Sequence, residues 1–457
     1  MWQPQLDPGR PRFLAIADAL GDDVTSGRLP GGERLPTHRD LAGTLGLSVG
    51  TVTRAYAEAE KRGLIHSEVG RGTFVRSATQ GPFAWFGLGD RPPSFVDLSM
   101  SWPCYEHDPD LGATLKRIAR RADVDTLMRY QSNSGMSRHR AIGSQWLRGF
   151  GLSVDPTRVM VCAGAQHALQ VLLSSLAGPG DIVLAEDLTY PGIKVAADLM
   201  GVKLVGVPLD EEGIRVDALE DLCKRKQPKA LYTIPCIQNP TTGTLSLKRR
   251  KAIAEIAERY GMAIMEDDVH RLLDDDAPPP ISSFVPEQGY YIGSLSKAIS
   301  GGIRVAFLAV PSRSIERIER AIWATLWMVS PLCAEVACTW IEDGSAELTV
   351  AKKRAEARAR TDATRERFGG NLRCRPSGYH SWLQLPEQWQ APAFAEEARK
   401  RGVGVTPADA FFIGSGTPPR AVRISMSAAR SLETLNIGLD RLAGLLEEAP
   451  GLGSAIV

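Results

Sequence analysis

The most informative stretch of this chain is Gly293-Ser294-Leu295-Ser296-Lys297-Ala298-Ile299-Ser300-Gly301-Gly302-Ile303-Arg304. An apolar run leads into two hydroxyls and a lysine, and an arginine follows seven residues after that lysine. Lysine can form a Schiff base with an aldehyde, and hydroxyls with a forked guanidinium can hold a phosphate. An aldehyde that carries a phosphate is pyridoxal 5′-phosphate (PLP). The alternative is a surface lysine beside a loop arginine. Other segments of the sequence are needed to choose between this alternative and a PLP site.

The composition is that of an ordinary globular protein, with 43% hydrophobic and 23% charged residues among 457. The net charge of +1 gives no overall sign of nucleic acid or membrane. A run of about eighteen apolar residues is absent, and the first residues lack the pattern of a signal peptide. The seven cysteines are dispersed and form no C-x-x-C pair, which favours reduced thiols in a cytoplasm over a zinc site.

From about residue 96, short apolar runs alternate with longer amphipathic stretches. This alternation predicts βαβ units, and therefore an α/β fold with a mostly parallel sheet covered by helices. The block from about 335 to 457 is first helical and then holds short strands, which predicts a smaller α+β subdomain. The apolar runs are 159–162, 182–185, 204–207, 230–234, 263–265, 290–292 and 305–310.

Four more segments follow predicted strands and carry groups suited to PLP. The turn 163–167 opens a helix, whose N-terminus attracts phosphate. Tyr190 can stack on a flat ring, and Asn239 can donate its amide to a phenolate oxygen. Asp267 can keep a pyridinium nitrogen protonated, so that the ring accepts electrons. Taken singly, each has a plainer alternative: a glycine turn, a core aromatic, an Asn-Pro turn or a solvated acidic turn.

In their order and spacing, these segments resemble the aminotransferase class I/II family of fold-type I PLP enzymes, over about residues 96 to 450. The resemblance implies that Lys297 forms the Schiff base and that Asp267 binds the pyridine nitrogen. It further implies that Asn239 binds the phenolic oxygen O3′ and that Tyr190 stacks on the ring. The implied phosphate ligands are Ala165, Gln166, Ser294, Ser296 and Arg304.

The same resemblance covers two residues farther from the lysine. Tyr130 is similar to the family tyrosine that reaches the phosphate of the neighbouring subunit, which implies a homodimer. Arg423 is similar to the arginine that grips the substrate carboxylate in a bidentate fork.

Two departures from the family pattern put ordinary transaminase kinetics in doubt. His270 stands where the family has a tyrosine; it can donate to O3′ and titrates near neutrality, or it fills space beneath the ring. The polar stretch 137–140 replaces a more apolar pattern.

Residues 1 to 76 follow a different pattern, with three helices and a hairpin. Apolar residues recur at helical spacing over 13–24, and Thr37 and Ser48 are placed to cap helices over 38–45 and 49–61. Two short runs, 64–66 and 73–75, then flank a glycine-containing turn. A helix-turn-helix followed by a hairpin is a winged helix-turn-helix.

This segment resembles the GntR-type DNA-binding domain over nearly all of residues 12 to 76. The resemblance implies that the helix after Ser48 enters the major groove of a double-stranded DNA operator. Basic residues exceed acidic ones by only 10 to 9 in residues 1–80, so a protein-docking module is the alternative. Val49 and Gly50 at the helix start predict sparse base contacts. The candidate DNA contacts are Arg34, Arg39, Thr51, Thr53, Arg54 and Arg71, and the matching stretches are 32–42, 45–48, 51–56, 63–65 and 70–75.

The Gly- and Pro-containing stretch 77–95 predicts a linker between domains 1–76 and 96–457. A GntR-type head joined to an aminotransferase-like domain resembles the MocR/GabR transcription regulators of bacteria. That resemblance implies that the large domain senses PLP and an amino-compound or vitamin B6 effector, and that a cytoplasmic dimer engages DNA. The alternatives are an active aminotransferase with an appended DNA-binding head and a scaffold without cofactor.

Overall fold

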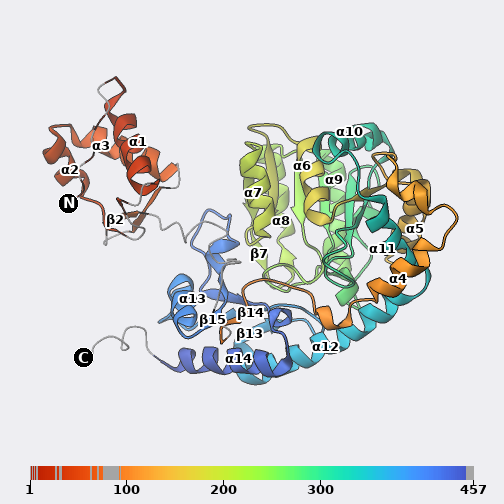
Figure 1. Ribbon diagram of the computed structural model, residues 1–457. Coiled ribbons are helices and arrows are strands. Elements are labelled where there is room, and N and C mark those ends of the chain that lie inside the picture. Colours follow the sequence, from red (N-terminus) through yellow and green to blue (C-terminus); the bar gives the residue numbers. More distant parts are fainter. Residues whose placement is uncertain are drawn as a thin grey trace. The chain divides into compact units, whose positions relative to one another are not determined.

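The computed structural model describes residues 9–25, 28–29, 33–61, 64–68, 72–75, 92 and 94–448, together with residues 2, 4 and 6. The chain divides into two compact units, Met1–Asp90 and Arg91–Val457, which Figure 1 shows in ribbon form. Within the described residues, no helix has both the length and the apolar character that crossing a membrane requires.

The first unit is a winged helix-turn-helix, as the sequence predicts. Thr37 Oγ1 accepts from the Asp40 N–H over 3.3 Å and begins the second helix, which Gly46 ends in the left-handed conformation at φ 61°. Ser48 Oγ accepts from the Thr51 N–H over 3.2 Å at the start of the third helix. These are the bonds that end-of-helix N–H groups need. The elements are α1 (Arg12–Thr25), α2 (His38–Leu45), α3 (Val49–Lys61) and the antiparallel strands β1 (Ile65–Glu68) and β2 (Gly72–Val75).

The second unit is built on a seven-stranded sheet with the order β4-β12-β11-β10-β9-β5-β6. β12 runs antiparallel to both of its neighbours, and the other adjacent pairs are parallel, which confirms the mostly parallel sheet. Each apolar run predicted as a strand forms one. The strands are β4 (Val159–Cys162), β5 (Ile182–Glu186), β6 (Lys203–Val207), β9 (Ala230–Thr233), β10 (Ala263–Asp267), β11 (Gly289–Ser294) and β12 (Ala306–Ala309).

Helices cover both faces of this sheet, because successive strand residues point to opposite sides. In β4, Val159 and Val161 face a core shared with α4, α5, α11 and α12 (Ser345–Phe368), whereas Met160 and Cys162 face a core shared with α6, α7 and α10. A third cluster joins the sheet to α8 and α9. The helices are α4 (Leu111–Ala119), α5 (Ser137–Arg148), α6 (Ala165–Leu176), α7 (Pro191–Leu199), α8 (Val216–Lys226), α9 (Leu247–Tyr260), α10 (Ile315–Thr325) and α11 (Pro331–Glu342).

The long helix α12 (Ser345–Phe368) leads into the smaller subdomain, which has a four-stranded sheet of order β13-β14-β17-β16. β3 (Val96–Asp97), at the start of the unit, pairs in parallel with β15 (Val403–Gly404), which brings the following residues 98–103 beside the subdomain. The remaining elements are β7 (Leu209–Asp210), β8 (Gly213–Ile214), β13 (Leu372–Cys374), β14 (Ser381–Gln384), α13 (Ala391–Lys400), β16 (Thr406–Pro407), β17 (Ala421–Ile424) and α14 (Leu432–Glu447).

Candidate cofactor and effector site

Lys297 lies in the turn that follows β11, at the carboxyl edge of the parallel strands, where ligands of open α/β sheets bind. Its Nζ donates to the Ser101 carbonyl over 2.5 Å. Burial, together with the nearby Arg423 and Arg304, lowers the pKa of Lys297 to about 8. A lysine with a lowered pKa is more often a free amine at neutral pH, and the free amine is the form that attacks an aldehyde.

Asp267 is the last residue of β10 and is 4% exposed. Tyr232 of β9 donates its hydroxyl to Asp267 Oδ2 over 2.7 Å, whereas Oδ1 is buried and has no hydrogen-bond partner among the residues described. Burial raises the pKa of Asp267 to about 6, against the lowering effect of the Tyr232 bond. A buried carboxylate oxygen without a partner is unfavourable unless a donor reaches it. A protonated pyridine nitrogen is such a donor.

Arg423 of β17 lies beside Asn239, in the loop after β9. Its Nη1 donates to Asn239 Oδ1 over 2.7 Å, and its Nη2 donates to the Ser99 carbonyl. The guanidinium also lies over the Phe411 ring, 4.8 Å from the centroid. Burial lowers the pKa of Arg423 to about 9. The contact with Arg423 occupies the acceptor of Asn239, which leaves the Nδ2 donor of that amide for a ligand oxygen.

The predicted phosphate ligands lie together around the start of α6. Gly164 precedes that helix with φ 80°, a backbone conformation that favours glycine, and the missing side chain lets Arg304 Nη2 come to within 2.5 Å of where a Cβ would lie. Arg304 donates to Ser296 Oγ over 3.3 Å and to the Ala163 carbonyl over 3.4 Å, and Ser294 Oγ accepts from the Ser296 N–H over 3.2 Å. The first N–H groups of α6, from Ala165 onward, complete a cradle suited to an anion.

Gln166 and Tyr190 lie at the same edge of the sheet. Gln166 Nε2 donates to the Gly192 carbonyl over 3.3 Å, and its Oε1 is buried without a partner among the described residues. Tyr190 immediately precedes α7, and its ring passes so close to Gly192 that a Cβ there would be 2.2 Å from a ring carbon. Tyr190 is therefore packed against the first turn of its helix, and its predicted stacking on the cofactor stays a prediction.

Tyr130 stands apart from this cluster, with 83% of its surface exposed and its ring 5.7 Å from that of Trp327. The role that the resemblance gives Tyr130 belongs to the site of a second subunit. That role also stays a prediction.

His270 and His380 form a buried pair beside the lysine, with ring centroids 5.4 Å apart. Burial lowers the pKa of His270 well below its ordinary value of 6.5, and the positive charges of Lys297 and Arg423 act in the same direction. The expectation that His270 titrates near neutrality is therefore wrong. Its imidazole is neutral at that pH because it is 2% exposed and lies close to two cations.

The stretch 137–140, the other departure from the family pattern, has a structural role. His139 Nε2 lies 2.8 Å from Glu335 Oε2, and Arg138 Nη2 lies 3.3 Å from the other oxygen of that carboxylate. Arg121 also contacts Glu335. Glu335 is fully buried on α11, so these contacts join α5 to α11 and compensate a buried negative charge.

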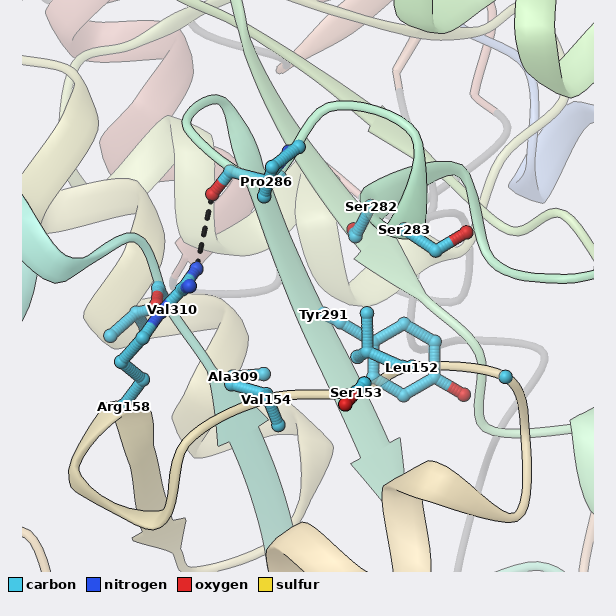
Figure 2. A pocket seen from close by; sticks show the side chains of 12 residues that line it. Leu152, Ser153, Val154, Arg158, Ser282, Ser283, Pro286, Tyr291, Ala309 and Val310 are labelled. Atoms are coloured by element: carbon cyan, nitrogen blue, oxygen red, sulfur yellow. Dashed lines mark hydrogen bonds between the residues drawn. The ribbon is translucent and has the colours of Figure 1, made fainter.

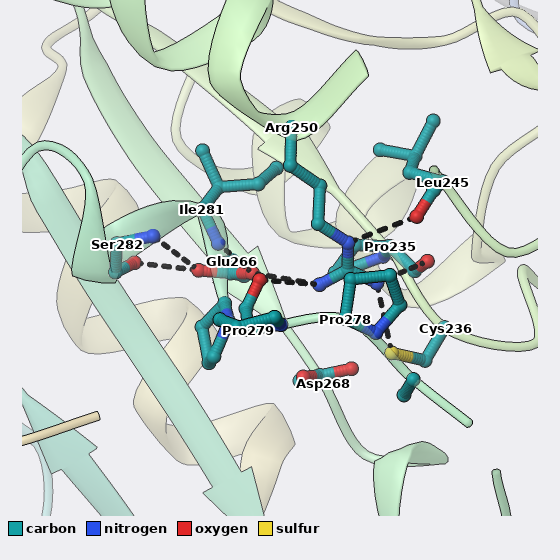
Figure 3. Close-up of polar contacts among 12 residues, drawn as sticks. Pro235, Cys236, Leu245, Arg250, Glu266, Asp268, Pro278, Pro279, Ile281 and Ser282 are labelled. Atoms are coloured by element: carbon teal, nitrogen blue, oxygen red, sulfur yellow. Dashed lines mark hydrogen bonds and ion pairs between the residues drawn. The ribbon is translucent and has the colours of Figure 1, made fainter. Parts of the chain in front are cut away.

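A second polar cluster holds the strand ends in place (Figure 3). Glu266, the neighbour of Asp267, accepts from the Ile281 N–H over 2.8 Å and from Ser282 Oγ over 2.6 Å, and Arg250 Nη1 lies 3.8 Å away. Arg250 also donates to the carbonyls of Leu245 over 3.0 Å and Pro235 over 2.9 Å, at the two ends of the loop that holds Asn239. Arg250 thus links the Asn239 loop to the end of β10.

The chemistry of Lys297, Asp267, Arg304 and their surroundings is suited to PLP. Asp267 Oδ1 is buried and has no hydrogen-bond donor among the described residues. Gly164 and Arg304 form a cradle for an anion. Lys297, which precedes Arg304 in the sequence, has a lowered pKa. Three contributors were not identified from the sequence: Tyr232, His380 and the carbonyls of the 98–103 segment. Tyr232 pairs with Met265, two residues before Asp267, on the adjacent strand, a signal that appears only once the strand register is known.

A separate pocket lies at the opposite end of the sheet (Figure 2). Gly289, at the amino end of β11, lines it together with Leu152 and Tyr291, whereas Lys297 follows the carboxyl end of the same strand. Arg158 uses its guanidinium to donate to the carbonyls of Val310 over 2.9 Å and Pro286 over 3.1 Å. This pocket is therefore not part of the lysine site.

The candidate DNA contacts that the structure describes lie on or near α2, α3 and the hairpin. Thr51 and Thr53 bond locally, to Ser48 Oγ over 2.9 Å and to the Val49 carbonyl over 3.0 Å, and Arg54 lies 4.4 Å over the Phe13 ring. Arg34 and Arg39 are exposed, and the side chain of Arg34 rests against Gly72 of the hairpin. Arg71 lies outside the described residues.

Comparison with known proteins agrees with both halves of this description. The model of the aminotransferase class I and II family matches residues 93–442, and that of the gntR family of bacterial regulatory proteins matches residues 13–75. The fold and the site thus define a fusion of a winged helix-turn-helix with a fold-type I aminotransferase domain. The chain belongs to the aminotransferase class I and II family and carries a GntR-family domain, the combination typical of MocR-like regulators.

Relatives of two kinds are similar to this chain. The uncharacterized HTH-type transcriptional regulator YdeF of Bacillus subtilis (strain 168) is 32% identical over 452 residues, which are 98% of this chain and 97% of that protein. The 2-aminoadipate transaminase of Thermus thermophilus is 29% identical and covers 64% of this chain and 75% of its own length. The crystal structure of LysN, the α-aminoadipate aminotransferase of Thermus thermophilus, complexed with N-(5′-phosphopyridoxyl)-L-leucine, matches with a TM-score of 0.70 at 27% identity, over 78% of this chain and 92% of that one.

Proposed function

We propose that this protein is a PLP-dependent bacterial transcription regulator that acts in the cytoplasm as a homodimer. Its winged helix binds double-stranded DNA, and its aminotransferase-like domain senses an amino compound. The observation that carries the proposal is that one chain matches the aminotransferase class I and II family over residues 93–442 and the gntR family over residues 13–75. Relatives named HTH-type transcriptional regulators match nearly the whole chain, whereas the aminotransferases match only its larger part.

The residues of the large unit divide the work of sensing. Lys297 would hold PLP through a Schiff base, Asp267 Oδ1 would accept from the pyridine nitrogen, and Arg304 with the start of α6 would hold the phosphate. When bound, PLP would supply an aldehyde that selects amines and a ring that withdraws electrons. Arg423 would bind the carboxylate of the amino compound, because a planar fork matches two carboxylate oxygens.

DNA-binding assays test the proposal. Fluorescence anisotropy with the DNA that lies upstream of this gene should show an affinity that changes when PLP and an amino compound are added. Turnover of an amino donor with 2-oxoglutarate should be slow in the same preparation. Rapid turnover with no effect of PLP or amine on DNA affinity would instead favour an aminotransferase with an appended head, and absence of DNA binding would favour a protein-docking module.

A further inference from the structure

His380 contributes a hydrogen-bond acceptor that nothing in the cofactor site uses. It is fully buried immediately before β14, and its Nε2 lies 3.0 Å from the Gln238 carbonyl oxygen. A carbonyl can only accept, so Nε2 carries the proton. Burial, followed by the charge of Arg423, lowers the pKa of His380 to about 3, so the ring is neutral. Its Nδ1 is therefore an unprotonated acceptor, and it has no partner among the described residues.

This acceptor belongs to the surroundings of the lysine. The His270 ring is 5.4 Å away, and both Lys297 and Arg423 lie close enough to lower the pKa of His380. Trp382, two residues after His380, pairs with Arg423 across the β14–β17 ladder. His380 therefore lies near both the residue proposed to hold PLP and the residue proposed to hold the effector carboxylate.

We infer that His380 determines effector specificity by accepting a hydrogen bond from a neutral donor group, a hydroxyl or a carboxamide N–H, on the side chain of the amino compound. The inference rests on the proposed function, in which an amino compound enters this site. A buried acceptor without a partner is unfavourable, so a ligand that supplies the donor gains relative to one that does not.

The surrounding charges narrow the class of donor. Arg423 already places a cation near the His270–His380 pair, and a second cation on the ligand side chain would add repulsion. A carboxylate on the ligand side chain has only acceptor oxygens, whose lone pairs would repel the lone pair of His380 Nδ1. A neutral hydroxyl or amide avoids both conflicts.

The test uses the full-length protein loaded with PLP and pairs of amino acids of similar shape. The pairs are serine with 2-aminobutyrate, homoserine with norvaline, and asparagine with leucine. Binding is followed by the change in the visible spectrum of the cofactor and by calorimetry. In wild type, we expect at least one pair in which the member with the donor binds about tenfold or more tightly.

Two variants separate recognition from a merely structural role. His380→Phe keeps a planar ring but removes the acceptor, and should reduce that preference to about twofold or less. His380→Gln keeps both a donor for Gln238 and an acceptor, and should retain part of the preference. Loss of the Gln238 contact alone would lower the melting temperature of His380→Phe and weaken all ligands equally, without changing the ratio within a pair.

Three results would overturn the inference. An equal ratio in wild type and His380→Phe, or a wild type that prefers no member with a donor, would remove His380 from recognition and leave the proposed function intact. A wild type whose spectrum responds to no amino compound would overturn both this inference and the sensing of amines, while PLP absorption and DNA binding would still report on the rest of the proposed function.

Discussion

Arg423 Nη1 donates to Asn239 Oδ1 over 2.7 Å, so the residue proposed to grip the effector is bonded to the residue proposed to hold the cofactor oxygen. Both side chains are buried, at 3% and 7% exposure. The bond connects β17 of the smaller subdomain with the loop after β9 of the large sheet. A carboxylate that binds Arg423 must therefore share it with Asn239 or displace that contact, which couples the effector position to the cofactor position.

Replacing Arg423 tests this coupling. Arg423→Lys keeps a positive charge but loses the fork, and we expect the affinity for amino acids to fall about tenfold or more while PLP remains bound. Spectral titration with amino acids measures the first effect, and the visible absorption without amino acid measures the second. The matched control is Arg420→Lys, which changes an arginine next to the same strand. Equal losses in the two variants would contradict the role of Arg423.

Lys297→Ala should abolish covalent retention of PLP. The amine at position 297 has a pKa lowered to about 8 by burial, whereas an alanine offers no group for the aldehyde. We expect the visible absorption of the Schiff base to vanish and borohydride reduction to attach no cofactor to the chain. Lys194→Ala is a control, because Lys194 is also partly buried with a pKa lowered to about 8, yet its Nζ donates to the carbonyls of Ala410 and Phe412. Covalent PLP in Lys297→Ala would show that another lysine is used.

Asp267→Asn should separate cofactor binding from stability. Asn keeps an acceptor for Tyr232 but cannot hold a proton on the pyridine nitrogen, so PLP affinity should fall about tenfold or more. Without PLP, the native pKa of about 6 exceeds the reference value of 3.8, so the native state binds the proton more tightly than the unfolded state. Wild-type stability should therefore fall as the pH rises from about 4 to about 6, by up to about 3 kcal/mol.

Urea unfolding of the PLP-free proteins checks this pH dependence. Asp267→Asn should lack the decrease and be the more stable protein at about pH 8. A wild type and a variant with parallel stability curves would show that the buried carboxylate carries no such cost. Tyr232→Phe provides the opposite control, because it removes the donor to Oδ2 and should destabilise the protein by about 1–3 kcal/mol.

The helices, the strands and the residues at the strand ends could be predicted from the sequence, because they depend on neighbouring residues. Apolar runs mark the strands, Thr37 and Ser48 mark helix starts, and the Lys297 segment directly follows a strand. Three features could not be predicted. Tyr232 meets Asp267 only through the register of two strands, and Ser99 and Ser101 reach the site only because β3 pairs with β15. The pKa of His270 is lower than expected because the folded chain buries its ring and brings Lys297 and Arg423 near it. Neither cation is adjacent to His270 in the sequence.

Arg39 and Arg54 of the first unit are both candidates for contact with DNA. Arg39→Ala and Arg54→Ala should each weaken binding to the DNA upstream of this gene and reduce the slope of log affinity against log salt by about 1, because each removes one cation from the predicted DNA-binding surface. Arg54 already lies over the Phe13 ring, so its substitution should also cost a little stability in the first unit, and unfolding of the head must be followed in parallel. Arg10→Ala is the control, because Arg10 is paired with Asp18 and lies before the helix-turn-helix. PLP absorption should be the same in all three variants. DNA affinity that changes equally in all three would mean that only the net charge of the head matters, whereas unchanged affinity in Arg39→Ala and Arg54→Ala would remove both arginines from the DNA contact.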